Sequence, residues 1–295
     1  MSRGDLQVLR RDGESAQGSA GALVFLGDGR TLVASGESGG LLAWDVAGGE
    51  VRWTGEGHRM DVAELVVAGD GARVISAAWD QTVRVWDAAS GVQLHAFDGG
   101  DGGYGCVDVS PDGTRIAAGT GGGEVWVWDA RGKLLKVLRG HADAVMAVQF
   151  VGEDVVSASS DRTMRWWDPR RGKLLRTSGL PDGATGQVRW AADAGQMLVT
   201  CEDHTIRVLG GDGAQVRVLA GHTDFVYAPR WAPDGRRVAS AADDRTVRVW
   251  DAVSGQCLRC WTVPEEYAWC VAWGQDGRTL ASSQPGGAVR LWDPG

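Results

Sequence analysis

Lysine, cysteine, proline and long apolar runs are all scarce in this sequence. Only 3 of its 30 basic residues are lysines, and 38 acidic residues leave a formal net charge of −8. A nucleic-acid binder usually carries a basic face, so we expect no nucleic acid as partner. Apolar runs stay far below the roughly 20 residues of a membrane span, and the first residues lack a secretory signal, so we expect no membrane partner and a cytoplasmic location. The arginine excess indicates a GC-rich genome and says little about the fold. Independently of it, we expect a bacterial source.

The five cysteines do not form a disulfide pattern, because their number is odd and their spacing irregular. They are Cys106, Cys201, Cys257, Cys260 and Cys270. Cys257 and Cys260 form a C-x-x-C pair that could be half of a redox or metal site. We favour a structural interpretation, because residues three apart in a strand point to opposite faces and no second pair or histidine completes a metal site. We therefore expect no metal and no cofactor.

Glycine and tryptophan are plentiful, with 45 and 15 residues, and the tryptophans mark an internal repeat. The dipeptide Trp-Asp ends six segments, at Trp44, Trp86, Trp128, Trp167, Trp250 and Trp292. A seventh segment has Leu209 in place of the tryptophan. The period of about 42 residues is typical of a solenoid or propeller. Seven such repeats fill the chain, so we predict a single domain over residues 1–295.

Each repeat is predicted to hold four short antiparallel strands. In the sixth repeat these are 226–231, 237–242, 246–251 and 256–261, as alternating apolar residues and short turns indicate. An Asp-Gly pair recurs between the first two strands of five repeats, at 28–29, 70–71, 112–113, 234–235 and 276–277. Asp-Gly favours a two-residue hairpin loop, which we expect at these turns.

These repeats resemble the WD-repeat (WD40) family over all 295 residues. Gly-His dipeptides open three of them, at 57–58, 140–141 and 221–222. The resemblance implies an all-β, seven-bladed β-propeller with four antiparallel strands per blade. The last repeat lacks its fourth strand, while residues 6–10 resemble the fourth strand at 215–219. We therefore expect the N-terminal segment 6–10 to complete blade 7 together with residues 268–293.

The resemblance also implies a hydrogen-bonded tetrad of His, Ser, Asp and Trp within a blade. Three repeats match it, with His58, Ser76, Asp80 and Trp86; His141, Ser157, Asp161 and Trp167; and His222, Ser240, Asp244 and Trp250. Serine, histidine and aspartate also make catalytic triads. Three equally spaced copies favour a repeated structural brace, so we predict no catalytic residues and no enzyme. Blades 1, 3, 5 and 7 are incomplete, which indicates either an ancestral two-blade unit or a functional role of these blades.

Propellers of this family mostly bind partners on the face formed by the d–a and b–c loops around the central channel. Our candidates for this face are Trp79, Tyr104, Phe225, Tyr227, Asp243, Tyr267 and Trp269. Tyrosine and tryptophan are enriched in binding hot spots. The nearby acidic residues favour a basic peptide through charge and cation–π contacts. The alternative interpretation is that these aromatic rings pack between blades.

The sequence therefore predicts a monomeric, non-catalytic platform, a scaffold or sensor, that binds a protein or peptide. One alternative is a reader of a small molecule or modified peptide through an aromatic pocket. Another, less favoured, is an enzyme built on a propeller, which needs converging titratable groups. The chain is either a stand-alone protein or a domain of a larger signalling protein.

Overall fold

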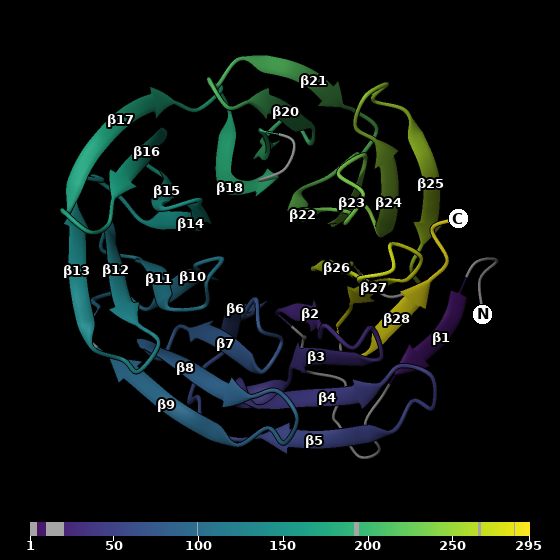
Figure 1. Cartoon of the computed structure of the whole chain (residues 1–295). Coiled ribbons are helices and arrows are strands. Elements are labelled where there is room, and N and C mark those ends of the chain that lie inside the picture. The colour runs from purple at the N-terminus through teal and green to yellow at the C-terminus, as the bar shows by residue number, and fades with distance from the viewer. Residues whose placement is uncertain (1–4, 10–20, 99, 192–194, 265–266, 286) are drawn as a thin grey trace. The chain divides into compact units, whose positions relative to one another are not determined.

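A computed structural model describes residues 5–9, 21–98, 100–191, 195–264, 267–285 and 287–295. Their strands form seven four-stranded antiparallel sheets, seen in Figure 1. The single helical element in these ranges is the short 3₁₀ turn η1 (Glu37–Gly39). The predicted all-β fold with seven propeller blades of four strands is confirmed.

The blades follow the order of the repeats. Blade 1 contains β2 (Leu23–Phe25), β3 (Thr31–Ser35), β4 (Leu41–Asp45) and β5 (Val51–Gly55); blade 2 contains β6 (Val62–Val67), β7 (Arg73–Ala78), β8 (Thr82–Asp87) and β9 (Gln93–Asp98). Blade 3 contains β10 (Tyr104–Val109), β11 (Arg115–Thr120), β12 (Glu124–Asp129) and β13 (Leu134–Arg139); blade 4 contains β14 (Val145–Val151), β15 (Asp154–Ser159), β16 (Thr163–Asp168) and β17 (Lys173–Gly179). Blade 5 contains β18 (Ala184–Ala191), β19 (Gln196–Cys201), β20 (Ile206–Gly210) and β21 (Gln215–Leu219); blade 6 contains β22 (Val226–Trp231), β23 (Arg237–Ala242), β24 (Thr246–Asp251) and β25 (Cys257–Thr262). Blade 7 contains β26 (Val271–Trp273), β27 (Leu280–Ser283), β28 (Val289–Trp292) and β1 (Asp5–Leu9).

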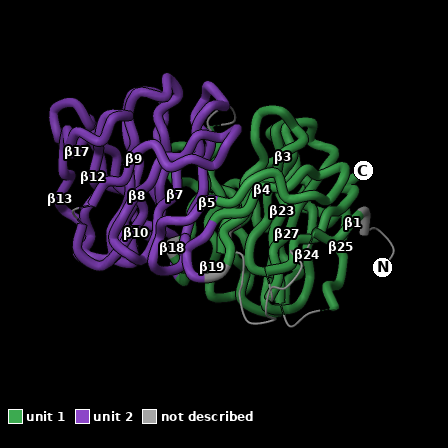
Figure 2. The backbone as a smooth tube through the Cα atoms, turned by 90° about the horizontal axis from the view of Figure 1, so that it is seen from below, with its two compact units in different colours: residues 1–37, 41–54, 183–295 green, residues 38–40, 55–182 purple. Residues whose placement is uncertain are grey.

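The chain divides into two compact units, coloured separately in Figure 2. Unit 1 contains residues 1–37, 41–54 and 183–295 and so carries blades 5, 6 and 7 with nearly all of blade 1. Unit 2 contains residues 38–40 and 55–182 and carries blades 2, 3 and 4. The single-domain organisation over 1–295 stays a prediction.

The first three strands predicted for the sixth repeat match β22, β23 and β24 residue for residue. The turns between first and second strands differ from the two-residue hairpin that we expected. In blade 1, Leu26 N donates to the carbonyl of Thr31, so the loop is longer than two residues. Asp28 then accepts the backbone N–H of Arg30, and Gly29 has φ of 64°, a conformation that suits glycine.

Strand β1 completes blade 7, as predicted. It pairs antiparallel with β28, with Leu9 opposite Val289 and Val8 opposite Arg290, and Figure 1 shows the two strands side by side. The predicted segment 6–10 overlaps β1 at 6–9, and residue 10 lies outside the described residues. Segments from opposite ends of the chain therefore form one sheet.

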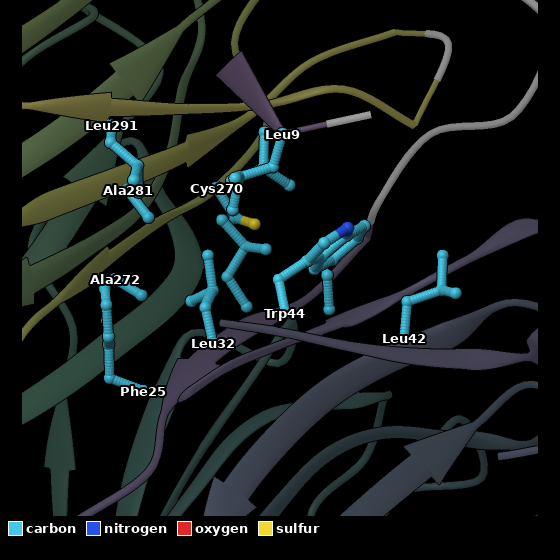
Figure 3. Close-up of a cluster of buried hydrophobic side chains, with 12 residues drawn as sticks. Leu9, Phe25, Leu32, Leu42, Trp44, Cys270, Ala272, Ala281 and Leu291 are labelled. Carbon is cyan, nitrogen blue, oxygen red and sulfur yellow. The ribbon is translucent and has the colours of Figure 1, made fainter. Parts of the chain in front are cut away.

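This pairing buries side chains from both ends of the chain in one core. Leu9 of β1 lies in a cluster with Trp44 of β4, Cys270 and Leu291 of β28 (Figure 3). Each of these four side chains is buried. Burying a leucine-sized side chain contributes about 1.5–3 kcal/mol, so the N-terminal strand stabilises blades 1 and 7 as well as satisfying the edge of β28.

Candidate functional site

The tetrad of blade 6 is a continuous chain of hydrogen bonds. Trp250 Nε1 donates to Ser240 Oγ over 2.8 Å, and Ser240 Oγ lies 2.7 Å from His222 Nε2. His222 Nδ1 lies 2.8 Å from Asp244 Oδ2. Because the carboxylate only accepts, Nδ1 carries the proton and Nε2 accepts from the serine hydroxyl. Every polar atom along this line has a partner.

Blades 2 and 4 repeat this geometry. Trp86 and Trp167 each donate over 2.8 Å to their serines, Ser76 and Ser157. The His58 Nε2–Ser76 Oγ distance is 2.6 Å and the His141 Nε2–Ser157 Oγ distance is 2.8 Å. The other ring nitrogens lie 3.1 Å from Asp80 and 2.8 Å from Asp161. The structure thus brings all twelve predicted tetrad residues together in three sets.

A threonine that sequence reasoning missed extends each tetrad. Thr82, Thr163 and Thr246 donate their hydroxyls to the tetrad aspartates over 2.7, 2.6 and 2.6 Å. The signal was present in the sequence, because each threonine follows its aspartate by two residues. Each aspartate also accepts the backbone N–H of its threonine, the side-chain-to-backbone bond two residues along the chain that is typical of aspartate. The threonine fixes the carboxylate that orients the histidine.

Burial determines the charge of the tetrads. It lowers the pKa of His58, His141 and His222 even though an aspartate lies beside each ring. Burial also raises the pKa of Asp244, but hydrogen bonds from His222 and Thr246 outweigh it and hold that pKa well below its usual range. The histidines are therefore neutral and the aspartates ionised at neutral pH.

These serine sets are closed to substrates. Ser76, Ser157 and Ser240 are buried, and each hydroxyl oxygen already accepts the indole N–H of its tryptophan. A nucleophilic serine has to reach the reacting carbon of its substrate. The geometry is that of a structural brace within each blade.

Tyr104, predicted at the binding face, is instead buried in blade 3 with 0% exposure. Its ring lies edge-on to Trp128 at 5.7 Å, much as His222 lies against Trp250 at 5.7 Å. Tyr104 stands at the register position where Val62 and Val226 are also buried. Gly100, at the position of the tetrad histidine, leaves room for the larger ring, because a Cβ there would lie 2.8 Å from the tyrosine hydroxyl. Tyr104 therefore fills the space of the missing histidine, and we exclude it from the binding surface.

The remaining aromatic candidates of blades 6 and 7 form one cluster, which we call the aromatic cluster: Phe225, Tyr227, Trp269 and Tyr267. Ring centroids lie 5.2 Å apart for Phe225 and Tyr227, 4.5 Å for Tyr227 and Trp269, and 5.9 Å for Tyr267 and Trp269. The central pair is stacked at 25°. The rings thus pack between two blades, as the alternative interpretation held, and they also remain accessible, with Trp269 37% exposed.

Asp243 fixes the centre of this cluster. The Tyr227 hydroxyl lies 2.9 Å from both carboxylate oxygens of Asp243. Burial and this hydrogen bond both raise the pKa of Tyr227, so its hydroxyl stays protonated and donates. Asp243 stands in the turn between β23 and β24, at the same end of the blade as the start of β22. The aromatic cluster therefore contains one oriented carboxylate.

Trp79 lies in unit 2 and is 43% exposed. Its indole ring packs on the backbone of Gly103 and Gly105, where added Cβ atoms would lie 3.0 and 3.3 Å from the ring. Glycine at both positions gives the ring a flat support. Trp79 is therefore a second exposed aromatic residue at the end of a blade.

The described residues contain no group of three or more His, Cys, Asp and Glu side chains arranged to hold a metal ion. No helix among them has the length and apolar character needed to cross a membrane.

Five segments of the chain match the WD40 family model, described as WD domain, G-beta repeat: residues 49–87, 91–129, 132–168, 213–251 and 255–293. Together they cover more than half of the sequence. The chain belongs to the WD40 family. The two repeats without a match end at Trp44 and Leu209, and the second of these has lost the tryptophan that defines the WD40 pattern.

Curated relatives share parts of this WD40 chain. The transcriptional corepressor LEUNIG_HOMOLOG of Arabidopsis thaliana is 30% identical over 132 residues, which is 43% of this chain and 16% of that protein. The nuclear distribution protein PAC1 of Arthroderma otae is 34% identical over 134 residues, 41% of this chain and 29% of that protein. The chain thus spans under a third of either relative. Both are eukaryotic proteins, so they give no support to the bacterial source that we expected.

Proposed function

We propose that this WD40 protein is a non-catalytic platform that binds a protein or peptide through the aromatic cluster of blades 6 and 7. The observation that supports this most is the stacked Tyr227–Trp269 pair, partly exposed and held by Asp243. Rigid aromatic side chains lose little entropy on binding and dominate many interfaces. Relatives named as a corepressor and a nuclear distribution protein agree with a scaffold role.

The cluster favours a basic peptide as occupant. Asp224 is exposed beside Phe225, and Asp243 is only partly buried by Tyr227. A cationic side chain placed over an indole face gains a cation–π contact of about 0.5–2 kcal/mol, and the carboxylates add Coulomb attraction. The overall charge of −8 acts in the same direction. Because Tyr227 and Trp269 stack on each other, the peptide lies across the rings instead of between them.

Three further expectations belong to this proposal. The binding face is the end of the blades where the first strands begin and the β23–β24 turn lies. Trp79 is a separate proposed contact in unit 2. The protein acts as a monomer in the cytoplasm.

Affinity capture tests this proposal. Wild type, a Tyr227→Ala/Trp269→Ala variant and a Val253→Ala control are used as bait in lysate of the native organism, and captured proteins are quantified by mass spectrometry. Val253 is 68% exposed in the turn between β24 and β25, at the other end of blade 6. We expect partners shared by wild type and the control to be lost from the double variant, with its melting temperature within a few degrees of wild type. An unchanged set of partners in a folded double variant would refute the proposal.

A further inference from the structure

Two of the five cysteines, Cys257 and Cys260, are exposed, whereas the other three are buried. Both lie on β25, the fourth strand of blade 6. The sequence predicted that residues three apart in a strand point to opposite faces. The strand register shows a different arrangement.

A β-bulge brings both thiols to the same face of the sheet. Cys257 is opposite Trp250 and Cys260 is opposite Arg248, with a register shift at Leu258. Trp250 and Arg248 are two residues apart and therefore share a face, and residues directly opposite each other in a ladder point to the same side. The prediction of opposite faces was wrong because the bulge adds one residue between the cysteines.

The Cys257 thiol is also directed along the strand toward Cys260. Cys257 Sγ lies 3.1 Å from the backbone carbonyl oxygen of Arg259, the residue bonded to Cys260. Burial raises the pKa of the Cys257 thiol, the neighbouring Cys260 adds to that rise, and the Arg248 guanidinium opposes it. A pair of thiols with a fixed cation beside them is thus present on the outer strand of blade 6.

A comparison with blade 2 separates the features that the two blades share from those found in blade 6. The same bulge places Gln93 opposite Trp86 and Ala96 opposite Arg84. There Arg84 Nη1 donates to Gln93 Oε1. The arginine and the bulge are therefore common to both blades, whereas in blade 6 two thiols replace an amide and a methyl group.

We propose that Cys257 and Cys260 bind one Cu(I) ion as a two-coordinate bis-thiolate site. Soft thiolate ligands select Cu(I), whereas a structural zinc ion takes four ligands in a tetrahedron. The described residues contain no group of three or more metal ligands here, so the pair suits a metal ion that can be bound by two ligands. The resulting complex carries one negative charge and lies beside the Arg248 guanidinium, which it shares with the Asp244 carboxylate 3.7 Å from that guanidinium.

The binding step is an exchange of protons for metal. Two S–H bonds break, two sulfur–copper bonds form, two protons leave to solvent, and copper stays in the +1 state. Metal–sulfur bonds of about 2.3 Å each let the two sulfur atoms stay much further apart than the about 2.0 Å of a disulfide. Thiols that are same-face neighbours on a strand therefore suit a bridging metal better than a disulfide.

Anaerobic competition with the Cu(I) chelator bicinchoninate tests the site on the full chain. We expect wild type to withdraw one Cu(I) per chain from the chelator. Cys257→Ser and Cys260→Ser should each weaken that binding at least about 100-fold, with unchanged melting temperatures. Wild type that binds no more Cu(I) than either serine variant would overturn the proposal.

A register control separates the shared face from the mere presence of two thiols. The exchange variant Arg259→Cys/Cys260→Arg keeps two cysteines on β25 but moves the second to the opposite face. We expect it to bind as weakly as Cys260→Ser. If the exchange variant, folded to the same melting temperature, withdraws copper as wild type does, the proposed geometry is wrong.

Discussion

Blades 6 and 7 hold the tryptophan of their Trp-Asp dipeptides in two different ways. In blade 6, Trp250 donates to Ser240, and His222 lies beside its ring. In blade 7, Trp292 keeps its bond to Ser282 over 2.9 Å, but no histidine is present and Trp261 stacks on its ring at 5.2 Å and 28°. One tryptophan is braced by a polar chain and the other mainly by an aromatic neighbour.

The same contrast separates blades 2 and 4 from blade 3. The residue three positions before each tetrad histidine lies on the fourth strand of the preceding blade, and before the complete blades it is small or aliphatic: Gly55, Leu138 and Leu219. At the equivalent positions before blades 3 and 7, the fourth strands of blades 2 and 6 carry Phe97 and Trp261, and Phe97 packs on Trp128 of blade 3 at 5.8 Å. Aromatic pairs contribute about 0.5–1.5 kcal/mol beyond their buried area, comparable to a net hydrogen bond. An incomplete tetrad in blades 3 and 7 thus coincides with a second way to anchor the tryptophan.

Removing residues 1–12 should have the largest effect on blade 7. The deletion takes away the fourth strand and the buried Leu9 side chain, and it exposes the edge of β28. Losing several kilocalories per mole lowers the melting temperature of a domain of this size by about 5–10 °C. Calorimetry should show this fall in melting temperature, and an unchanged value would contradict the role of β1 in closing blade 7.

Replacing the aromatic brace of blade 3 should come next. Phe97→Ala removes a buried ring from Trp128, and we expect a loss of about 3–5 kcal/mol in the free energy of unfolding. Leu94→Ala, on the same strand but exposed, serves as control and should cost under about 0.5 kcal/mol. Urea denaturation measures both, and equal effects would show that the ring does not brace Trp128.

Serine substitutions compare the two braces directly. Ser240→Ala leaves two buried groups without their partner, Trp250 Nε1 and His222 Nε2, whereas Ser282→Ala leaves only Trp292 Nε1. At about 1–3 kcal/mol for each orphaned group, the first variant should lose roughly twice as much stability. Denaturant unfolding of the two variants decides this, and equal losses would mean that the polar chain is no stronger than a single bond.

The pH dependence should give the smallest effect. The tetrad histidines have lowered pKa values in the folded protein, whereas in the unfolded chain they have the ordinary histidine pKa of about 6.5. As the pH falls through that value, the unfolded chain therefore binds protons that the folded chain does not bind. Their contribution to stability is therefore complete above that pH and falls as the solution is acidified toward pH 5. His222→Gln should make this decline shallower in melting curves, and a decline as steep as that of wild type would contradict the assignment.

Repetition is why the sequence predicted so much of this fold. Strands β22, β23 and β24 follow from spacings that recur along the chain, and the three tetrads follow from the resemblance to the WD40 family, at positions that recur in three of the seven repeats. Features that depend on a departure from the repeat could not be predicted in this way. Tyr104 stands 24 residues before Trp128, the spacing that also separates the buried Val62 from Trp86, so the repeat itself indicates its burial. That its ring takes the place of the histidine missing at Gly100 is a departure from the repeat, and no spacing indicates it.

The Cys257–Cys260 face shows the same limit for backbone geometry. Alternation along a strand is a rule for regular ladders, and one extra residue reverses its result. The bulge recurs in blades 2 to 6, but no residue type common to the bulge positions indicates it in the sequence. The stacking of Tyr227 on Trp269 likewise joins two blades that the sequence places about 40 residues apart.

The most direct test of the proposed function is the affinity of a basic peptide obtained by display selection against the full chain. Isothermal titration calorimetry would compare wild type, Tyr227→Ala/Trp269→Ala and the Val253→Ala control. Hot-spot side chains cost about 2 kcal/mol or more when truncated, so we expect Kd to rise at least about 30-fold in the double variant and to stay within about twofold in the control. A folded double variant that binds the peptide as tightly as wild type would contradict the assignment of the aromatic cluster as the binding surface.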